Sequence, residues 1–103
     1  MQKIINGKLY DTSKAELIHE WDNDIYGNDP RQCEAALYRT KKGAYFLVGS
    51  GGPMSRYAQS HGNKTSGGSG TQVISEQEAI AWLEENNGTP VLLKYFSEKI
   101  EEG

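Results

Sequence analysis

The hydrophobic pattern is strongest over residues 34–49, where two apolar stretches flank the turn sequence Lys41-Lys42-Gly43. A three-residue loop that ends in glycine is typical of a β-hairpin, because glycine takes a left-handed conformation without Cβ strain. The pattern therefore predicts an antiparallel hairpin over residues 34–49, which we expect to form the centre of a sheet.

The register of this hairpin follows from pairing Thr40 with Ala44, and it divides the side chains between two faces. One face carries Ala36, Tyr38, Phe46 and Val48, and the other carries Leu37, Arg39, Tyr45 and Leu47. Because the first face is the more apolar, we expect it to be the core. Arg39 and Tyr45 would then lie near the exposed tip of the second face.

Shorter patterns predict the elements before this hairpin. Asn6-Gly7 lies between two short apolar runs, which is the signal of a type I′ turn and predicts a small N-terminal hairpin. Residues 13–16 have the spacing of a capping box and predict the start of a short helix. Residues 17–21 could continue that helix or alternate as a strand, and residues 22–30 predict a loop.

The second half of the chain predicts a loop, a strand and two helices. Residues 49–70 are rich in glycine and lack apolar periodicity, so we expect a long loop there, followed by a strand over residues 71–74. Residues 75–78 form a second capping box, which predicts a helix that ends near residues 86–88. Thr89-Pro90 is typical of a further helix start. The apolar residues Leu92, Tyr95, Phe96 and Ile100 recur at helical spacing after it.

These elements predict an α+β fold, in which a small antiparallel sheet centred on residues 34–49 packs against C-terminal helices. A chain of 103 residues, of which 36% are apolar and 24% charged, has material for one domain, so we expect residues 1–103 to form a single domain. No apolar run approaches the roughly 20 residues of a membrane-spanning helix. We expect a cytoplasmic protein that binds no membrane.

Charge is segregated along the chain, whose net charge is −3. Residues 31–64 hold six cationic side chains against one glutamate, while residues 1–30 and 65–103 carry an acidic excess. The six cations are Arg31, Arg39, Lys41, Lys42, Arg56 and Lys64. Two interpretations stay open: the basic and acidic regions attract partners of opposite sign, or they attract each other within the fold.

Two motifs suggest chemistry only weakly. Gly49-Ser50-Gly51-Gly52-Pro53 follows a predicted strand, and if Pro53 begins a helix, its free N–H groups could hold an anion with help from Arg56 and Tyr57. A flexible turn is the alternative interpretation. Cys33 and His61 could form a nucleophile and base, but no third group orients them. We therefore expect no enzyme, and neither a metal nor another cofactor.

Aromatic and basic side chains are interleaved around the predicted hairpin, as on surfaces that bind single-stranded nucleic acids or phosphate-bearing complexes. We expect Arg39, Lys41, Lys42, Tyr45, Arg56 and Tyr57 to contact a partner. A sequence pI near 5.3 argues against tight nonspecific binding of nucleic acid. The acidic helices could instead occupy a basic groove that is meant for nucleic acid.

Several blocks of the chain resemble a family of short proteins from phages and mobile elements of Gram-positive bacteria. The blocks are residues 8–12, 15–18, 37–47, 51–58, 78–79 and 82–85, among them Lys8-Leu9-Tyr10-Asp11-Thr12 and Gly51-Gly52-Pro53-Met54-Ser55-Arg56-Tyr57-Ala58. The resemblance carries no catalytic motif. It implies a genomic setting in which small non-enzymatic proteins act against host defence, anti-CRISPR proteins included.

The resemblance and the charge pattern together favour a stoichiometric inhibitor that binds a host defence complex, such as a nuclease of the Cas9 type, in the cytoplasm of the bacterial host. Two alternatives stay open. One is an accessory protein that binds nucleic acid through the basic hairpin. The other is a sponge for a nucleotide or small ligand that uses the glycine-rich loop.

Overall fold

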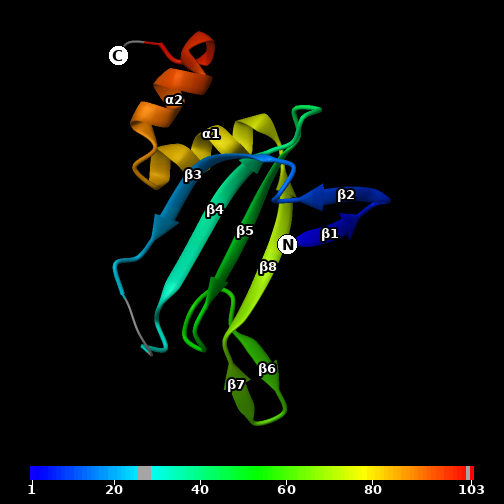
Figure 1. Cartoon of the computed structure of the whole chain (residues 1–103). Coiled ribbons are helices and arrows are strands. Elements are labelled where there is room, and N and C mark those ends of the chain that lie inside the picture. The colour runs from blue at the N-terminus through cyan, green and yellow to red at the C-terminus, as the bar shows by residue number, and fades with distance from the viewer. Residues whose placement is uncertain (26–28, 102) are drawn as a thin grey trace.

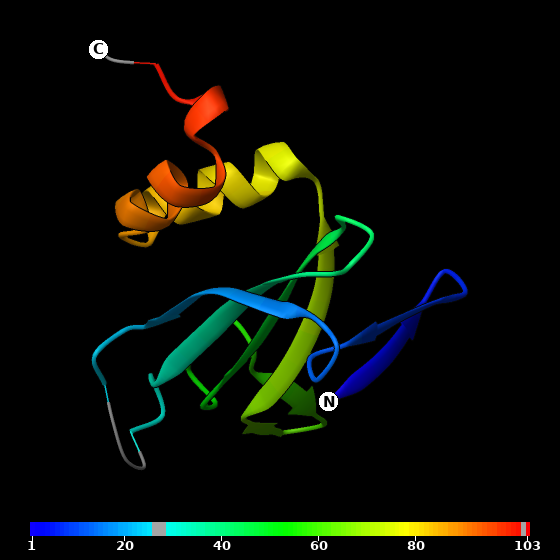
Figure 2. The ribbon, with the colours of Figure 1, turned by 45° about the horizontal axis from the view of Figure 1, so that its top comes forward.

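The computed structural model of the chain describes residues 1–25, 29–101 and 103, and it confirms an α+β fold. Four strands form one antiparallel sheet in the order β3-β4-β5-β8. They are β3 (Glu16–Asp22), β4 (Cys33–Arg39), β5 (Tyr45–Gly51) and β8 (Gly68–Ile74). Helices α1 (Glu76–Glu85) and α2 (Thr89–Tyr95) follow and lie over one side of the sheet, as Figures 1 and 2 show. A 3₁₀ turn over Ser97–Lys99 comes after α2.

Two small hairpins accompany this sheet (Figure 1). The first consists of β1 (Gln2–Ile5) and β2 (Lys8–Asp11), and the second of β6 (Gln59–His61) and β7 (Lys64–Ser66). The first hairpin is confirmed: Asn6 and Gly7 have φ angles of 53° and 77°, as a type I′ turn requires.

The central hairpin has the predicted register. Tyr38 pairs with Phe46 and Leu37 with Leu47, and the Thr40 N–H donates to the Ala44 carbonyl over 2.8 Å. Gly43 closes the turn with a φ of 88°. Turn chemistry and strand alternation were therefore sufficient to align these two strands.

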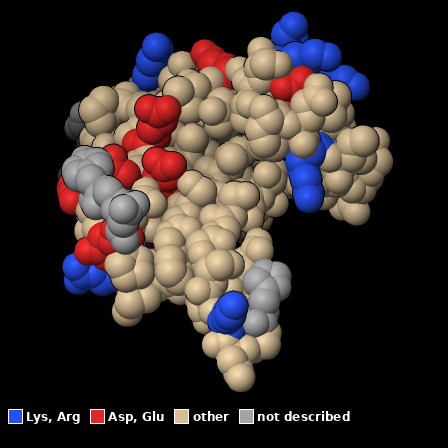
Figure 3. Space-filling view, turned by 60° about the horizontal axis from the view of Figure 1, so that its bottom comes forward, with Lys and Arg blue, Asp and Glu red and all other residues tan. Residues whose placement is uncertain are grey.

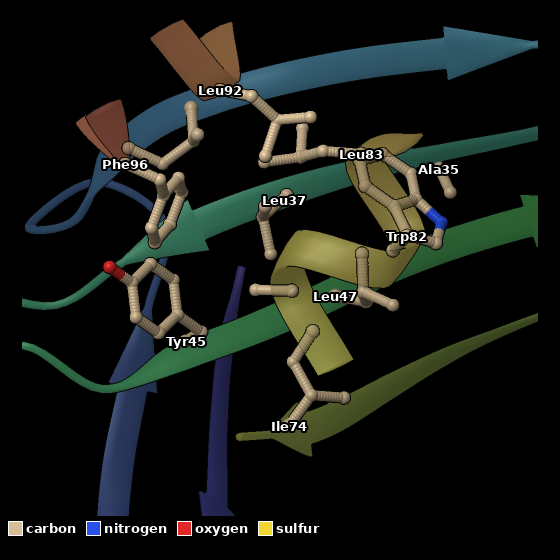
Figure 4. Packing of buried hydrophobic residues seen from close by; sticks show 11 residues of the cluster. Ala35, Leu37, Tyr45, Leu47, Ile74, Trp82, Leu83, Leu92 and Phe96 are labelled. Carbon is tan, nitrogen blue, oxygen red and sulfur yellow. The ribbon is translucent and has the colours of Figure 1, made fainter. Parts of the chain in front are cut away.

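The prediction of which hairpin face is the core is wrong. The helices pack on the face that carries Leu37, Tyr45 and Leu47, whereas Ala36, Tyr38 and Val48 on the opposite face are only half-buried. Figure 4 shows the helical side chains against this face: Trp82 and Leu83 come from α1, and Leu92 and Phe96 from α2 and its end.

The outer strands explain this choice of face. β3 and β8 contribute the buried Ile18 and Ile74 to the helix side. On the other side the register places Glu20 next to Ala36 and Thr71 next to Val48. The apolar Leu17 and Val73 also lie on that side, but they stay 43% and 37% exposed. The apolar face of a sheet is a property of all its strands, so the two central strands alone did not determine it.

Phe46 is nevertheless fully buried on the side away from the helices, because the N-terminal hairpin covers it. The Tyr10 ring meets the Phe46 ring edge-on with 5.4 Å between centroids, and Tyr38 stacks on Phe46 at 5.3 Å. The sheet thus has a helical cover on one side and a small aromatic cluster on the other.

The predicted helix start at residues 13–16 is wrong, since this segment is a turn that leads into β3. The Asp11 carboxylate accepts hydrogen bonds from the Ser13 N–H and hydroxyl, over 2.9 and 2.7 Å. Glu16 accepts from the Tyr95 hydroxyl at 3.0 Å instead of capping Ser13. Side-chain bonds of this kind stabilise a turn in competition with a helix.

The expectation of one long loop over residues 49–70 is also wrong. β5 continues to Gly51, the β6–β7 hairpin follows, and β8 begins at Gly68 instead of residue 71. Pairing of Gly49 with Gly70 and of Gly51 with Gly68 extends the sheet through positions without side chains. Glycine in a strand marks a close approach of other groups, which hydrophobic periodicity does not reveal.

The two helices form as predicted, with differences at their ends. Ser75 and Glu78 make both hydrogen bonds of the capping box. Gly88, the residue before the predicted start at Thr89-Pro90, takes the N-cap position of α2, and α2 ends at Tyr95, so Ile100 lies outside it. Gly88 fits because any Cβ there would come within 2.7 Å of the Leu83 side chain.

The core makes a direct prediction for two leucines of the helical region. Leu83 is fully buried and Leu93 is 57% exposed. We expect Leu83→Ala to lower the free energy of unfolding by about 2–5 kcal/mol, because it leaves a cavity, and Leu93→Ala to lower it by less than about 1 kcal/mol. Urea unfolding of both variants tests this, and equal losses would contradict the packing described.

Candidate interaction surface

The turn between β4 and β5 presents a cluster of cations, as the sequence predicts. Arg39 ends β4, and Lys41 and Lys42 follow it in the turn. All three residues are exposed, because the strand pairing ends at this point and leaves the turn outside the sheet.

Lys41 and Lys42 lie on one wall of a groove of about 650 Å³ between the β4–β5 turn and the N-terminal hairpin. The opposite wall consists of Gly7 to Asp11 with Lys14 and Ala15. Lys8, Lys14, Lys41 and Lys42 thus surround the groove, and Leu9, Tyr10, Ala15 and Ala44 give it apolar lining. We call this feature the lysine groove. Figure 3 shows a group of basic side chains at the upper right, the side where β1 and β2 lie in Figure 1, and most of the acidic ones at the left, with further basic side chains at the left edge and the lower end.

Asp11 is the one acidic residue among the described residues that line the lysine groove. The Gln2 side-chain amide donates to its carboxylate at 3.0 Å, beside the two bonds from Ser13. These hydrogen bonds, with that from Gln2 first, lower the pKa of Asp11 to about 2. The carboxylate is therefore ionised at neutral pH and is held within the chain, so the groove keeps an excess of positive charge.

Among the described residues, one ion pair joins the basic segment 31–64 to an acidic segment, and it is made by Arg31. Across residues 1–25, 29–101 and 103, ion pairs join Arg31 to Asp29 at 3.0 Å and Lys99 to Glu76 at 3.4 Å. Neither pair links the basic segment 31–64 to the acidic segment 65–103. Internal pairing of the basic segment is therefore confined, among the described residues, to Arg31 with Asp29, and its other five cations make no ion pair with a described residue.

Tyr45 does not belong to this surface, and its predicted exposure at the hairpin tip is wrong. It is 8% exposed and packs against Phe96, with ring centroids 5.7 Å apart (Figure 4). Burial raises the pKa of its hydroxyl. Because the helices cover this face of the hairpin, Tyr45 belongs to the core.

Arg56 and Tyr57 lie at the other end of the sheet, beyond the end of β5. The seven residues of β5 separate them from the turn lysines by about 20 Å along the strand. Tyr57 is half-buried, and its ring rests on Gly49, where any Cβ would overlap it. Arg56 lies over that ring at 5.6 Å and is exposed. The six predicted contact residues therefore do not form one site.

The glycine-rich loop after β5 does not have the expected geometry for binding an anion. No helix begins at Pro53, since the described residues 52–58 form turns. The backbone N–H groups of Gly52 and Met54 donate to the Gln32 and Pro30 carbonyls, over 2.9 and 2.7 Å. Those of Ser55, Tyr57 and Ala58 donate to groups within the loop. These donors hold the loop against the chain and are not free for a phosphate.

The cysteine and histidines have structural surroundings where they are described. Cys33 is buried, and burial raises the pKa of its thiol, which opposes formation of a nucleophilic thiolate. The side chain of His61 lies outside what the structure describes. His19 donates from Nε2 to the Asn86 carbonyl at 2.9 Å and meets the Trp82 ring edge-on, so it joins β3 to the end of α1.

Sequence reasoning missed Lys8 and Lys14, because both belong to a segment with an acidic excess. The turn at Asn6-Gly7 indicates that Lys8 lies just after a hairpin tip. Nothing in the local sequence shows that this tip reaches the β4–β5 turn. That proximity depends on the contact of Tyr10 with Phe46, which joins residues distant along the chain.

Comparison with family models, with curated proteins and with solved structures found no match to the chain. Within the described residues, no helix combines the length and apolar character needed to cross a bilayer. Histidine, cysteine and carboxylate side chains form no group of three or more that could hold a metal ion in the same residues. The candidate site is therefore judged on its own geometry.

The glycine contacts of Tyr57 give a second prediction. We expect Gly49→Ala to destabilise the protein by about 1–3 kcal/mol, because the added Cβ overlaps the Tyr57 ring. Gly70→Ala is the matched control, since its Cβ would stand at an ordinary 3.7 Å from the same ring. Urea unfolding should also show coupling between Gly49→Ala and Tyr57→Ala. Additive losses in the double variant would contradict this packing.

Asp11 gives a prediction for pH. Because its pKa is lowered in the folded chain, its hydrogen bonds stabilise the fold fully above about pH 4, and this stabilisation is lost as the pH falls toward 2. We expect Asp11→Asn to lower the melting temperature at pH 7 and to reduce the difference in melting temperature between pH 7 and pH 2. Glu84→Gln, at an exposed position of α1, is the control. An unchanged pH difference in Asp11→Asn would refute this role.

Proposed function

We propose that this protein is a non-enzymatic binding protein that inhibits a host defence complex, such as a CRISPR effector of the Cas9 type. The observation that supports the proposal is the cation cluster at the β4–β5 turn, where Arg39, Lys41 and Lys42 are exposed and make no ion pair with a described residue. The resemblance to short proteins of phages and mobile elements supports the choice of partner.

The chemistry of the surface suits binding by charge. Exposed cations on a rigid turn attract an acidic partner over about 8–10 Å at physiological ionic strength, and they accelerate its association. The hydrogen bonds and glycine of the turn fix the backbone that carries these cations, so ordering on binding is confined to their side chains. The described residues offer no comparable arrangement for bond-making chemistry, since Cys33 is buried with a raised thiol pKa.

The proposal predicts the effect of reversing the turn charges. The triple variant Arg39→Glu/Lys41→Glu/Lys42→Glu should fold, because all three side chains are exposed, and should lose inhibition. The measurement is DNA cleavage by a purified Cas9-type effector with increasing amounts of the protein. Phage plating on immune cells that express the chain is the cellular counterpart. The control Arg56→Glu/Lys64→Glu/Lys94→Glu makes the same charge change elsewhere and should inhibit like the wild type.

Other outcomes would point to the alternatives. Affinity for free DNA or RNA that falls steeply with salt, without association with the effector, would favour an accessory nucleic-acid-binding protein. A nucleotide that raises the melting temperature would favour a sponge. Loss of inhibition in the control triple variant alone would place the interface away from the β4–β5 turn, at Arg56, Lys64 or Lys94.

A further inference from the structure

We propose that the lysine groove is the docking site for an acidic, amphipathic segment of a partner protein. The inference rests on the proposed function, because Lys41 and Lys42 belong to both surfaces. It adds the N-terminal hairpin as the second half of the interface. It also assigns the chemistry of the bound segment, which combines carboxylates with apolar side chains.

The apolar lining provides the first argument. Leu9 is 48% exposed at the groove, and Ala15 and Ala44 line it as half-buried residues. Ile4, the cross-strand partner of Leu9, is 71% exposed, so two large apolar side chains adjoin on one face of the hairpin. Single exposed apolar residues are ordinary, but a pair beside an apolar groove indicates a surface that binds another molecule. Removing such apolar surface from water favours association.

The charge at the rim provides the second argument. Lys8, Lys14, Lys41 and Lys42 surround the groove, and the carboxylate of Asp11 faces the donors of Gln2 and Ser13. The lysines come from three separate segments of the chain, so their positive charges come close together only when the chain is folded. A bound segment needs carboxylates spaced around apolar anchors to complement it.

The aromatic content argues against nucleic acid as the occupant. Tyr10 is the one aromatic residue among the described groove residues, and it is 6% exposed with its ring against Phe46. No ring of the described lining is therefore available for a base to stack on, although base stacking contributes much of the affinity for single strands. The net charge of −3 also weakens binding of a long polyanion. A short protein segment needs no ring to stack on and carries fewer negative charges than a nucleic-acid strand, so both effects weaken its binding less.

Selection from a random linear peptide library displayed on phage, with the full chain as bait, tests the proposal. We expect the enriched peptides to combine Asp or Glu with large apolar residues. Lys8→Glu/Lys14→Glu should weaken their binding at least about tenfold in fluorescence anisotropy, and wild-type binding should weaken as salt rises. Both lysines are exposed, and a melting curve verifies that the variant folds. Lys64→Glu/Lys94→Glu carries the same charge change outside the groove and should bind like the wild type.

Four results would overturn the assignment. The enriched peptides are not acidic, or no peptide is enriched. Their binding could be equal in wild type and Lys8→Glu/Lys14→Glu. A single-stranded oligodeoxythymidylate could bind more tightly than the peptides and lose affinity in that variant, which would make the groove a nucleic-acid site.

The groove and the proposed function can fail separately. If Lys8→Glu/Lys14→Glu still inhibits the effector like the wild type, the groove assignment fails while the inhibitor stands. If peptides bind the groove as described but the wild-type chain has no effect on the effector, the inhibitor fails and the groove stands.

Discussion

The packing of α1 against the sheet is the interaction on which the other features depend. Leu83 and Trp82 press on the face that carries Leu37 and Leu47, and this contact decides which side of the central hairpin is internal. On the same face, Tyr45 is drawn into the core by its contact with Phe96 at the end of α2. Because strands alternate their side chains, fixing one face also fixes the other, and Phe46 is left on the side that the helices cannot cover.

The helices leave the sheet face that carries Phe46 uncovered. The N-terminal hairpin covers Phe46 there through Tyr10. This aromatic contact has a consequence for charge. It brings the tip that carries Lys8 beside the turn that carries Lys41 and Lys42, although like charges repel one another. The buried ring contact offsets that repulsion, and the resulting groove combines apolar lining with an uncompensated positive rim.

The glycines of residues 49–70 allow side chains and backbone to pack closely. Gly49 gives space for the Tyr57 ring, and Gly52 approaches the Pro30 carbonyl more closely than a side chain would allow. The loop N–H groups that could have met an anion are used to hold this arrangement. Glycine thus has two physical uses in proteins, ligand approach and close chain packing, and sequence pattern alone does not distinguish them.

The sequence alone determined the local features. These are the turns at Gly7 and Gly43, the register of the β4–β5 hairpin, the capping box at Ser75 and the exposure of Lys41 and Lys42. Each depends on residues close together along the chain, whose preferred conformations act without distant partners. Only the tertiary structure decided the core face, the burial of Tyr45, the separation of Arg56 from the turn and the recruitment of Lys8. Those depend on contacts between distant segments, where burial of side chains outweighs local preference.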